Sequence, residues 1–283
     1  MANIQVTCDS TCDLPQELCE KLNIAVIPLN IGMGGQFFRD GVDVTAEKLF
    51  SYVAQTNTLP TTAAVSPGDY ADFFRPFVEA GKTVIHINLS TKLSVCHQNA
   101  CLAAEELGNV YPIDSCNLSS GSGHLALAAA ELAAEGMEAP QIVEQLNEMK
   151  LRLDVSFIIQ TLDYLYKGGR CSGLAAFGAN LLKIRPEICV VDGGMQVGSK
   201  YRGSMEKTVL SYIDGRLAGR TDLDLRRIFV THSTMPDELV QKVIARVREL
   251  QPFEEVIESN AGCTISTHCG PACIGVLFFT KKA

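Results

Sequence analysis

Short apolar runs and amphipathic segments alternate along the first half of the chain. Runs rich in β-branched and apolar residues predict strands at 4–8, 24–33, 36–40, 82–90 and 110–113. Apolar residues at helical spacing predict helices at 14–22, 45–55, 70–80, 94–107, 122–135 and 140–152. Asp13 and Thr45 stand just before two of these helices, in the position of an N-cap. Such alternation is typical of a mainly parallel sheet flanked by helices.

The second half has a different order of elements. Strands are predicted at 155–160, 227–232, 254–259 and 274–279, and helices at 174–183, 205–218 and 236–250. Two strand-like runs within 188–202 meet at Asp192-Gly193-Gly194, which predicts a hairpin. We therefore expect an α/β protein with two domains, residues 1–153 and 154–283. No low-complexity linker separates the two halves, so we expect them to pack closely.

Composition narrows the classes of partner and the cellular environment. The chain has 283 residues, 47% of them hydrophobic, and a net charge of -8, whereas a protein that grips nucleic-acid phosphates normally carries a basic surplus. We find no run of about 18 uninterrupted apolar residues and no signal peptide at the start of the sequence. We therefore expect a cytoplasmic protein without an integral membrane segment and without nucleic acid as a partner.

The 11 cysteines are expected to be free thiols in a reducing compartment. No CxxC motif occurs, and the nearest pairs, Cys8 with Cys12 and Cys269 with Cys273, lie at opposite ends of the chain. A structural zinc site usually combines two close pairs. The spacing thus argues against a bound metal, and cysteine is expected to serve as a small buried apolar residue.

Polar residues at strand ends keep an enzyme as an alternative, because ligands of α/β sheets bind beyond the carboxyl ends of strands. Such residues here include Asp9, Ser10, Asn88, Ser90, Ser94, Asp114, Ser115 and His268. Most of them would equally cap a helix or form a turn. The sequence GSG at 121–123 lacks the GxSxG pattern of a nucleophile elbow, and the GxGxxA match that it opens does not directly follow a strand. His268 and Cys269 would point apart on an extended chain. A hydrolase or a nucleotide-using transferase therefore stays the alternative interpretation.

One arginine follows two glycines in the segment LDYLYKGGR at 162–170. The planar guanidinium of Arg170 suits a carboxylate or a phosphate. Gly168 and Gly169 allow the chain to approach a ligand or the other domain closely. An internal salt bridge with one of the 32 acidic residues would explain the same arginine. The residues alone leave both explanations open.

Six motifs occur in the order that the DegV family shows. They are DSTCDLP (9–15), VSPGDY (65–70), LSTKLSVCHQNA (89–100), VYPIDSCNLSSGSG (110–123), LDYLYKGGR (162–170) and HCGPACIGVLFF (268–279). The chain resembles this family over nearly its whole length, most specifically in the first and fifth motifs. The resemblance implies a two-domain α/β fold, in which the first sheet is mainly parallel and flanked by helices. The second domain would hold a mixed sheet with helices and a lipid tunnel.

The same resemblance implies a carrier without catalytic residues of its own. It implies one long-chain fatty acid in the tunnel, no cofactor besides that acid, and a separate fatty acid kinase as partner. The kinase would phosphorylate the bound carboxylate, and the carrier would deliver the acyl phosphate to phospholipid synthesis. Lys200 and Arg202 lie on an exposed strand of the predicted hairpin, so we expect them to help dock this partner.

Four residues of this chain match head-group contacts in the family's pattern: Thr62, Ser94, Arg170 and His268. Candidate tunnel walls are apolar residues of the second half, namely Phe157, Ile158, Ile159, Leu162, Phe177, Leu181, Leu182, Ile188 and Phe278. The loops at 62–66 and 93–97 depart from the family pattern, which keeps a carrier of a different small lipid open. His97 stands where the family has a tyrosine. It is expected to contact the head group, or else to lie at the surface or cap a helix.

Overall fold

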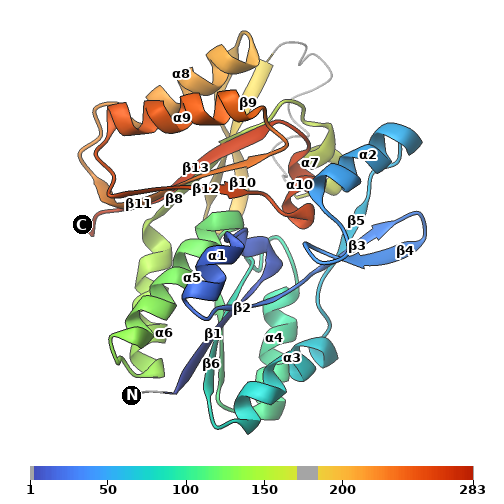
Figure 1. Cartoon of the computed structure of the whole chain (residues 1–283), viewed down its shortest axis with the longest axis vertical. Helices are drawn as coiled ribbons and strands as arrows, with labels where there is room; N and C mark the ends of the chain where they lie inside the picture. The colour runs from blue at the N-terminus through green and yellow to red at the C-terminus, as the bar shows by residue number, and fades with distance from the viewer. Residues whose placement is uncertain (1–2, 171–183, 283) are drawn as a thin grey trace.

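The computed structural model describes residues 3–170 and 184–282 (Figure 1). Its first part is built on a four-stranded parallel sheet in the order β2-β1-β6-β7. The strands are β1 (Ile4–Asp9), β2 (Ala25–Ile27), β6 (Thr83–Asn88) and β7 (Val110–Asp114). A six-stranded mixed sheet, in the order β10-β9-β8-β13-β11-β12, dominates the second part. The predicted α/β fold, with a parallel first sheet and a mixed second sheet, is confirmed.

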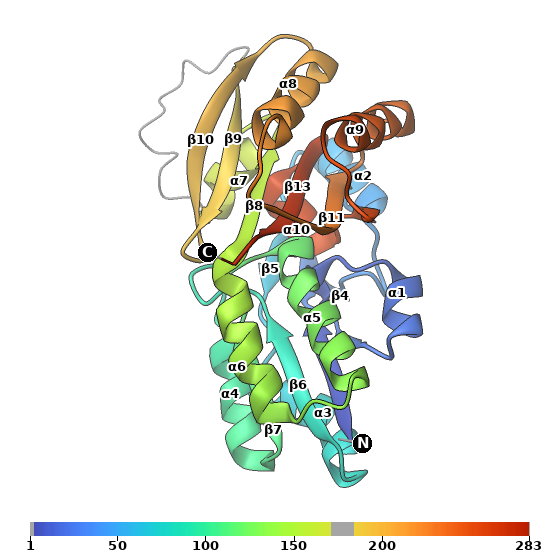
Figure 2. The same cartoon turned by 90° about the vertical axis from the view of Figure 1, so that its left-hand side faces the viewer.

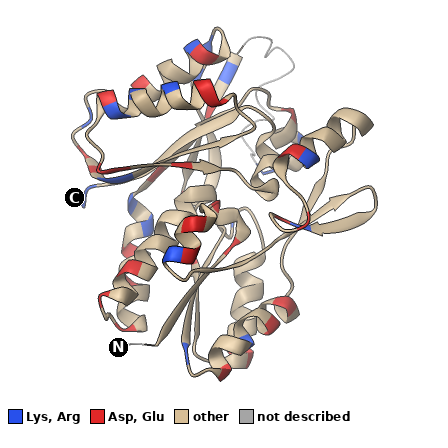
Figure 3. Ribbon diagram, viewed as in Figure 1, with Lys and Arg blue, Asp and Glu red and all other residues tan. Residues whose placement is uncertain are grey.

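The mixed sheet contains the predicted hairpin at one edge. Its strands are β8 (Leu153–Ile158), β9 (Ile184–Val191), β10 (Gly194–Arg202), β11 (Leu223–Ser233), β12 (Glu255–Asn260) and β13 (Cys273–Thr280). β9 and β10 pair antiparallel and turn at Asp192 and Gly193, both with positive φ. Helices α8 (Met205–Leu217) and α9 (Asp237–Leu250) cover one face of the sheet, and acidic and basic residues are interspersed along them (Figure 3).

Helix α5 (Ser119–Ala134) joins the cores of the two parts, because it packs against strands of both sheets (Figure 2). Almost its whole surface is buried over Ser119–Ala130. One apolar cluster contains its alanines and leucines together with Ile85 of the first sheet and Phe229 and Leu277 of the second. The other helices of the first part are α1 (Gln16–Lys21), α3 (Pro67–Glu79), α4 (Cys96–Leu107) and α6 (Ala139–Met149). Most helices were predicted within a few residues of their observed bounds.

A small antiparallel sheet beside the parallel one was not predicted. It has the order β4-β3-β5 and consists of β3 (Asn30–Met33), β4 (Gln36–Arg39) and β5 (Thr61–Ala63). The single strand expected over 24–33 is therefore wrong, since β2 and β3 belong to different sheets and the break includes Pro28. Proline lacks the N–H that a ladder needs, so the strand ends there. Helix α2 (Ala46–Thr56) is capped by Thr45, as predicted, because its side chain accepts from the Lys48 N–H.

Asp13 does not cap α1, contrary to the prediction. It has a φ of 48° and ends a 3-10 turn at Ser10–Cys12, whereas Pro15 occupies the N-cap position of α1. Its carboxyl group accepts hydrogen bonds from the Gly262 N–H at 2.8 Å and from the Ser119 hydroxyl. Burial raises the pKa of Asp13 to about 8, and the charge of Asp40 adds to this effect. Asp13 therefore links the first strand to the loop before α10 (Cys263–Cys269).

The cysteines agree with one further expectation, and one predicted helix lies outside the described residues. The ten cysteines within the described ranges are free thiols, and seven of them are buried. Within the same ranges, no helix combines the length and apolar character that a bilayer span requires. No group of three or more His, Cys, Asp or Glu in the described part of the chain is arranged to hold a metal ion. The helix predicted at 174–183 lies outside the described residues, wholly within the gap at 171–183.

Acidification is expected to weaken the contact of α5 with the second sheet through His124. This side chain is 1% exposed, its Nε2 lies 2.9 Å from the Leu277 carbonyl, and its ring meets Phe229 and Phe279 edge-on. Burial lowers the pKa of His124 to about 4, so the imidazole stays neutral in the fold. The unfolded chain takes up this proton below its ordinary pKa of about 6.5, and stability is therefore lost as pH falls from there toward 4.

Between pH 7 and pH 5 this residue should remove about 2 kcal/mol from the free energy of unfolding. Urea denaturation of the wild type and of His124→Phe at both pH values measures the effect, because phenylalanine keeps a ring at the site but cannot titrate. We expect the variant to lose about 2 kcal/mol less than the wild type over this pH interval. An equal loss in both proteins would show that His124 is not the titrating group.

Candidate ligand-binding site

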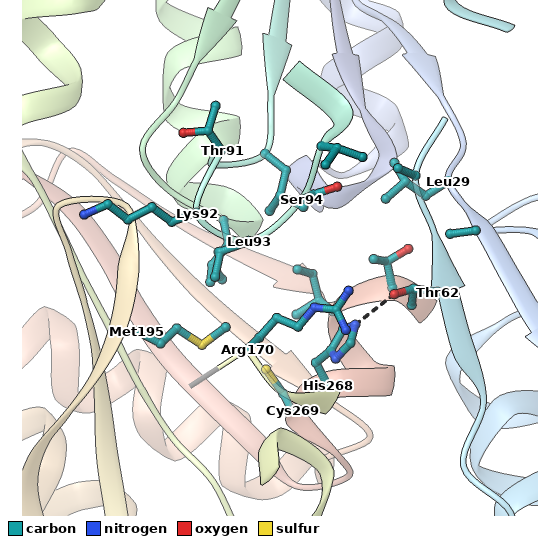
Figure 4. A pocket seen from close by; sticks show the side chains of 17 residues that line it. Leu29, Thr62, Thr91, Lys92, Leu93, Ser94, Arg170, Met195, His268 and Cys269 are labelled. Carbon is teal, nitrogen blue, oxygen red and sulfur yellow. Dashed lines mark hydrogen bonds between the residues drawn. The ribbon is translucent and has the colours of Figure 1, made fainter. Parts of the chain in front are cut away.

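A pocket of about 410 Å³ is lined by residues from both halves of the molecule, and all four predicted head-group residues lie on its wall (Figure 4). Thr62 is on β5, Ser94 precedes α4, and His268 is on α10. Arg170 follows α7 (Asp163–Gly168), the helix that the segment LDYLYKGGR forms. Four positions far apart in the sequence thus meet at one cavity.

Most of the remaining wall is apolar. It comprises Leu29, Ala63, Ala64, Leu89, Leu93, Val95, Leu118, Met195, Ile265 and Cys269, with Thr91, Lys92 and Thr264 as further polar members. No acidic residue is among these described wall residues, and Lys92 and Arg170 give the pocket two cationic side chains. The pocket therefore favours a ligand with an anionic group and an apolar body.

His268 and Thr62 contact each other across the pocket wall. The distance from Thr62 Oγ1 to His268 Nε2 is 2.9 Å (Figure 4). His268 Nδ1 is buried without a hydrogen-bond partner in the described part of the chain. Burial, and secondarily the charge of Arg170, lowers the pKa of His268 to about 4. The imidazole is therefore neutral at neutral pH and offers a single N–H donor.

Arg170 extends toward Thr62 and His268 (Figure 4). Its Nη1 donates to the Gly168 carbonyl at 2.6 Å. In the described ranges no carboxylate lies within ion-pairing distance of this guanidinium, and the sequence of 171–183, outside those ranges, contains no acidic residue. The internal salt bridge that the sequence left open is thus not what holds Arg170. Several of its N–H donors stay available to an anion.

Ser94 lies at the start of the turn that leads into α4. Its hydroxyl oxygen accepts from the Cys96 N–H at 3.2 Å, and the hydroxyl lies 3.2 Å from Cys96 Sγ. This local contact fixes the position of the Ser94 oxygen at the pocket wall. The hydroxyl hydrogen can turn from the weak sulfur acceptor to a stronger oxygen acceptor.

A second, much narrower cavity adjoins the pocket. The two share Leu118, Ile265 and Cys269, and the narrow cavity of about 20 Å³ continues past Phe157, Thr231 and Leu277 beside the mixed sheet. Of the predicted tunnel walls, Phe157 lines this cavity, whereas Ile159, Leu162 and Ile188 pack in the neighbouring apolar cluster. Phe177, Leu181 and Leu182 lie outside the described residues.

Two predicted wall residues lie on the wrong face of the sheet. Ile158 and Phe278 pack beneath α8 and α9, in a cluster with Val230 and Tyr212. Successive strand residues point to opposite faces, so Phe157 and Leu277 reach the cavity while their neighbours Ile158 and Phe278 cannot. The prediction that Ile158 and Phe278 line the tunnel is therefore wrong.

Sequence reasoning missed the helix that carries much of the site. Ile265, His268 and Cys269 line the pocket from α10, where no helix was predicted. The spacing of these residues, three and four apart, was the available signal for one helical face. Met195 on β10 and Leu118 before α5 were also missed, and no local pattern marks either of them.

Two other candidate features take positions away from the pocket. His97 is not among the residues that line it, and its ring contacts Asn88 and Cys101. Gly121 and Gly123 are buried within α5, where an added Cβ would lie 2.3 Å from Asn117 Oδ1 or 2.7 Å from the Cys12 carbonyl oxygen. These glycines permit close packing of α5 and leave no space for a dinucleotide.

The sequence of the chain is similar to those of one known protein family. A sequence model of the family described as "Uncharacterised protein, DegV family" matches residues 3–281. A DegV domain-containing protein of Caldanaerobacter subterraneus subsp. tengcongensis is 32% identical over 283 residues, which cover 99% of this chain and 100% of the relative.

Solved structures agree with the sequence comparison. A fatty acid-binding DegV family protein from Thermus thermophilus is 30% identical, with a TM-score of 0.88 over 98% of this chain and 99% of that chain. DegV, a fatty acid binding protein from Bacillus subtilis, is 27% identical, with a TM-score of 0.86 over 99% of this chain and 100% of that chain. Both of these solved relatives are described as fatty acid-binding proteins.

Proposed function

We propose, because this chain belongs to the DegV family, that it binds one long-chain fatty acid and presents the carboxylate to a separate fatty acid kinase. One observation carries the proposal: Thr62, Ser94, Arg170 and His268 converge on a pocket that is otherwise largely apolar. Solved relatives that bind fatty acids support the choice of ligand. In this proposal residues 1–153 and 154–283 are two domains that meet around the head group.

The head group would be held by hydrogen bonds and one full charge. His268 Nε2 would donate to Thr62, whose hydroxyl would then donate to the head group. Ser94 would donate a second hydrogen bond, and the guanidinium of Arg170 would balance the carboxylate charge. A buried carboxylate without such partners would be costly. With them, the same arrangement can hold a carboxylate before phosphorylation and an acyl phosphate after it.

The apolar tail would supply most of the binding energy. Each fully buried methylene contributes about 0.8 kcal/mol, so about 15 methylenes give a gross gain on the order of 12 kcal/mol before the costs of association. The tail would pass Leu118, Ile265 and Cys269, where the pocket and the narrow cavity meet. The cavity must widen for a long chain, which packed side chains allow by changing rotamers.

Organic extraction of the purified protein followed by mass spectrometry tests the choice of ligand. We expect about one fatty acid per chain, and after delipidation we expect saturable binding of palmitate. Arg170→Gln should weaken palmitate binding by at least tenfold, because it removes the cationic partner of the carboxylate. Lys167→Gln is the matched control, since it removes an exposed positive charge three residues earlier.

An empty extract together with no palmitate binding after lipid loading would reject the ligand class. Recovery of another stoichiometric lipid would instead identify a different small-lipid carrier, in keeping with the altered loops at 62–66 and 93–97. If Arg170→Gln and Lys167→Gln weakened palmitate binding equally, Arg170 would not be a head-group contact.

The chain would act as a carrier in the cytoplasm, with the fatty acid as its only bound small molecule and the kinase as the catalyst. Lys200 and Arg202 are exposed on β10. We predict that the double charge reversal Lys200→Glu/Arg202→Glu slows phosphorylation of the bound acid by a cognate fatty acid kinase at least tenfold at low salt, because like charges would then oppose docking. Palmitate affinity should stay unchanged.

The matched control for this docking prediction is Lys242→Glu/Arg246→Glu on α9, which also reverses two exposed charges. Kinase assays over a range of carrier concentrations separate a docking defect from a chemical one. A wild-type rate for the β10 variant would contradict the assignment of the docking surface.

A further inference from the structure

Three polar side chains form a connected row at the carboxyl end of β6, away from the fatty acid pocket. Cys101 Sγ lies 3.6 Å from His97 Nε2, and His97 Nδ1 lies 3.3 Å from Asn88 Oδ1. His97 and Cys101 are four residues apart on α4, so they share one face of the helix. Asn88 is the last residue of β6 and is fully buried. A possible nucleophile, Cys101, thus contacts a possible base, His97, which in turn contacts Asn88, a group that can orient the base.

The hydrogen bonds of Asn88 fix which ring nitrogen of His97 carries the proton. Asn88 Nδ2 lies 3.2 Å from Asp9 Oδ2 and 3.1 Å from the Tyr70 hydroxyl, and Tyr70 in turn donates to Asp9 at 2.6 Å. The carboxyl oxygens of Asp9 act as acceptors here, so the amide nitrogen must face Asp9 and the amide oxygen must face His97. The His97 Nδ1 is therefore the donor, and the lone pair of Nε2 faces the Cys101 thiol.

From this geometry we propose that Cys101 is a nucleophilic thiol that reacts with small hydroperoxides, with His97 as its general base and Asn88 as a positioning residue. Nucleophile, base and orienting group within hydrogen-bond reach are the signature of an activated side chain. Cys101 is half-buried, which admits a small oxidant such as hydrogen peroxide more readily than a bulky disulfide.

The resting pair is a neutral thiol beside a neutral imidazole. Burial raises the pKa of Cys101, and the charge of Glu105 adds to this. Burial also lowers the pKa of His97; the other groups that face His97 are Asp114 and Asp9, which oppose this shift, and His86 and Lys150, which add to it. His97 is thus already a free base at neutral pH, and the thiol proton moves as the sulfur attacks.

The reaction balances without any further reactant. Cys101 Sγ attacks one oxygen of the hydroperoxide, the S–O bond forms and the O–O bond breaks. The thiol proton passes to His97 Nε2 and from there to the leaving hydroxide or alkoxide, which gives water or an alcohol. Sulfur loses two electrons and the peroxide gains them, so the product is a sulfenic acid on Cys101.

Two other cysteines provide matched internal controls. Cys116 and Cys189 are also half-buried, and burial raises the pKa of each. The charged groups that face them within the described residues are Asp114, Lys150 and Lys92 for Cys116, and Glu187, Arg216 and Asp154 for Cys189. Neither set contains an imidazole, so neither thiol has an equivalent base.

The test treats the full chain with hydrogen peroxide, traps sulfenic acid with dimedone, and quantifies each cysteine peptide by mass spectrometry. We expect Cys101 to be labelled at least tenfold faster than Cys116 or Cys189. His97→Gln should bring Cys101 down to the rate of Cys116, and circular dichroism checks that this variant is folded. Between pH 8 and pH 6 the wild-type rate at Cys101 should fall less steeply than that at Cys116, because only Cys116 depends on free thiolate.

A rate at Cys101 that matches Cys116, or a rate that His97→Gln leaves unchanged, would overturn the proposal. If His97→Gln lowers the melting temperature, its labelling rate is set aside, and the pH dependence of labelling in the wild type alone tests whether His97 is the base. Parallel pH dependences for Cys101 and Cys116 would then exclude His97 as the base.

Discussion

Replacing Asp40 with alanine is expected to lower the free energy of unfolding by about 3 kcal/mol and to weaken palmitate binding. Asp40 is 3% exposed and caps α10 from a distant part of the chain. Its carboxylate accepts from the Cys263 N–H at 2.7 Å and from the Thr264 N–H at 3.0 Å, and it also accepts from the Ser10 hydroxyl. Hydrogen bonds to a charged group contribute about 1.5–3 kcal/mol each, and their loss leaves buried N–H groups unpaired.

The effect on binding follows from the same contacts, because α10 carries His268, Ile265 and Cys269 to the pocket wall. Asp43→Ala is the matched control, since that carboxylate is more exposed and pairs with Arg39 at the surface. Such pairs contribute little to stability. Urea denaturation and palmitate titration measure both effects. If Asp40→Ala were as stable as Asp43→Ala, the cap would not be what holds α10.

The alternation of strands and helices was predictable because each element carries its own periodicity. The helix at 45–55 was placed within a residue, and its cap Thr45 was recognised, since both signals are local. The hairpin at 188–202 was likewise marked by its turn residues Asp192 and Gly193. The split between β2 and β3 was not, because pattern alone does not say to which sheet a strand belongs.

Helix α10 shows why some elements could not be predicted from the residues that form them. The segment CTISTHC is rich in β-branched and small residues, which favour helices weakly. Its first N–H groups are instead paired with Asp40 and Asp13, more than 200 residues earlier in the chain. A cap supplied from such a distance leaves no trace in the sequence around the helix. The mistaken expectation of an N-cap at Asp13 has the same origin, since its carboxyl serves α10 and not α1.

The polar residues of the candidate site were predictable from the sequence, but the apolar wall of the pocket was not. Family motifs singled out Thr62, Ser94, Arg170 and His268, and the fold brings all four to one pocket. Their contacts with a ligand stay predictions. The tail wall was less predictable, because the choice between Phe157 and Ile158 depends on which face of β8 meets the cavity. Which face of β8 meets the cavity depends on how the whole mixed sheet packs, and the sequence of one strand does not determine this.

Replacing Gly168 with alanine is expected to weaken palmitate binding at least tenfold while leaving the fold intact. An added Cβ at this position would lie 2.4 Å from His268 Nδ1, so the imidazole must move and lose its 2.9 Å contact with Thr62. Gly168 ends α7 without a positive φ, and alanine favours a helix more than glycine does, so the backbone tolerates the change. Gly68→Ala in α3 is the control, since its nearest contact would be Ser66 Oγ at 3.9 Å.

A double-mutant cycle separates displacement of His268 from any other effect of the added methyl group. His268→Ala alone should weaken palmitate binding, because it removes one donor and opens space beside Gly168. Adding Gly168→Ala to that variant should then cost nothing further, since no imidazole is left to displace. If the glycine substitution weakened binding equally in both backgrounds, it would act independently of His268. The helix end at Gly168 would then have no part in holding the imidazole against Thr62, and the contact between α7 and α10 would serve stability alone.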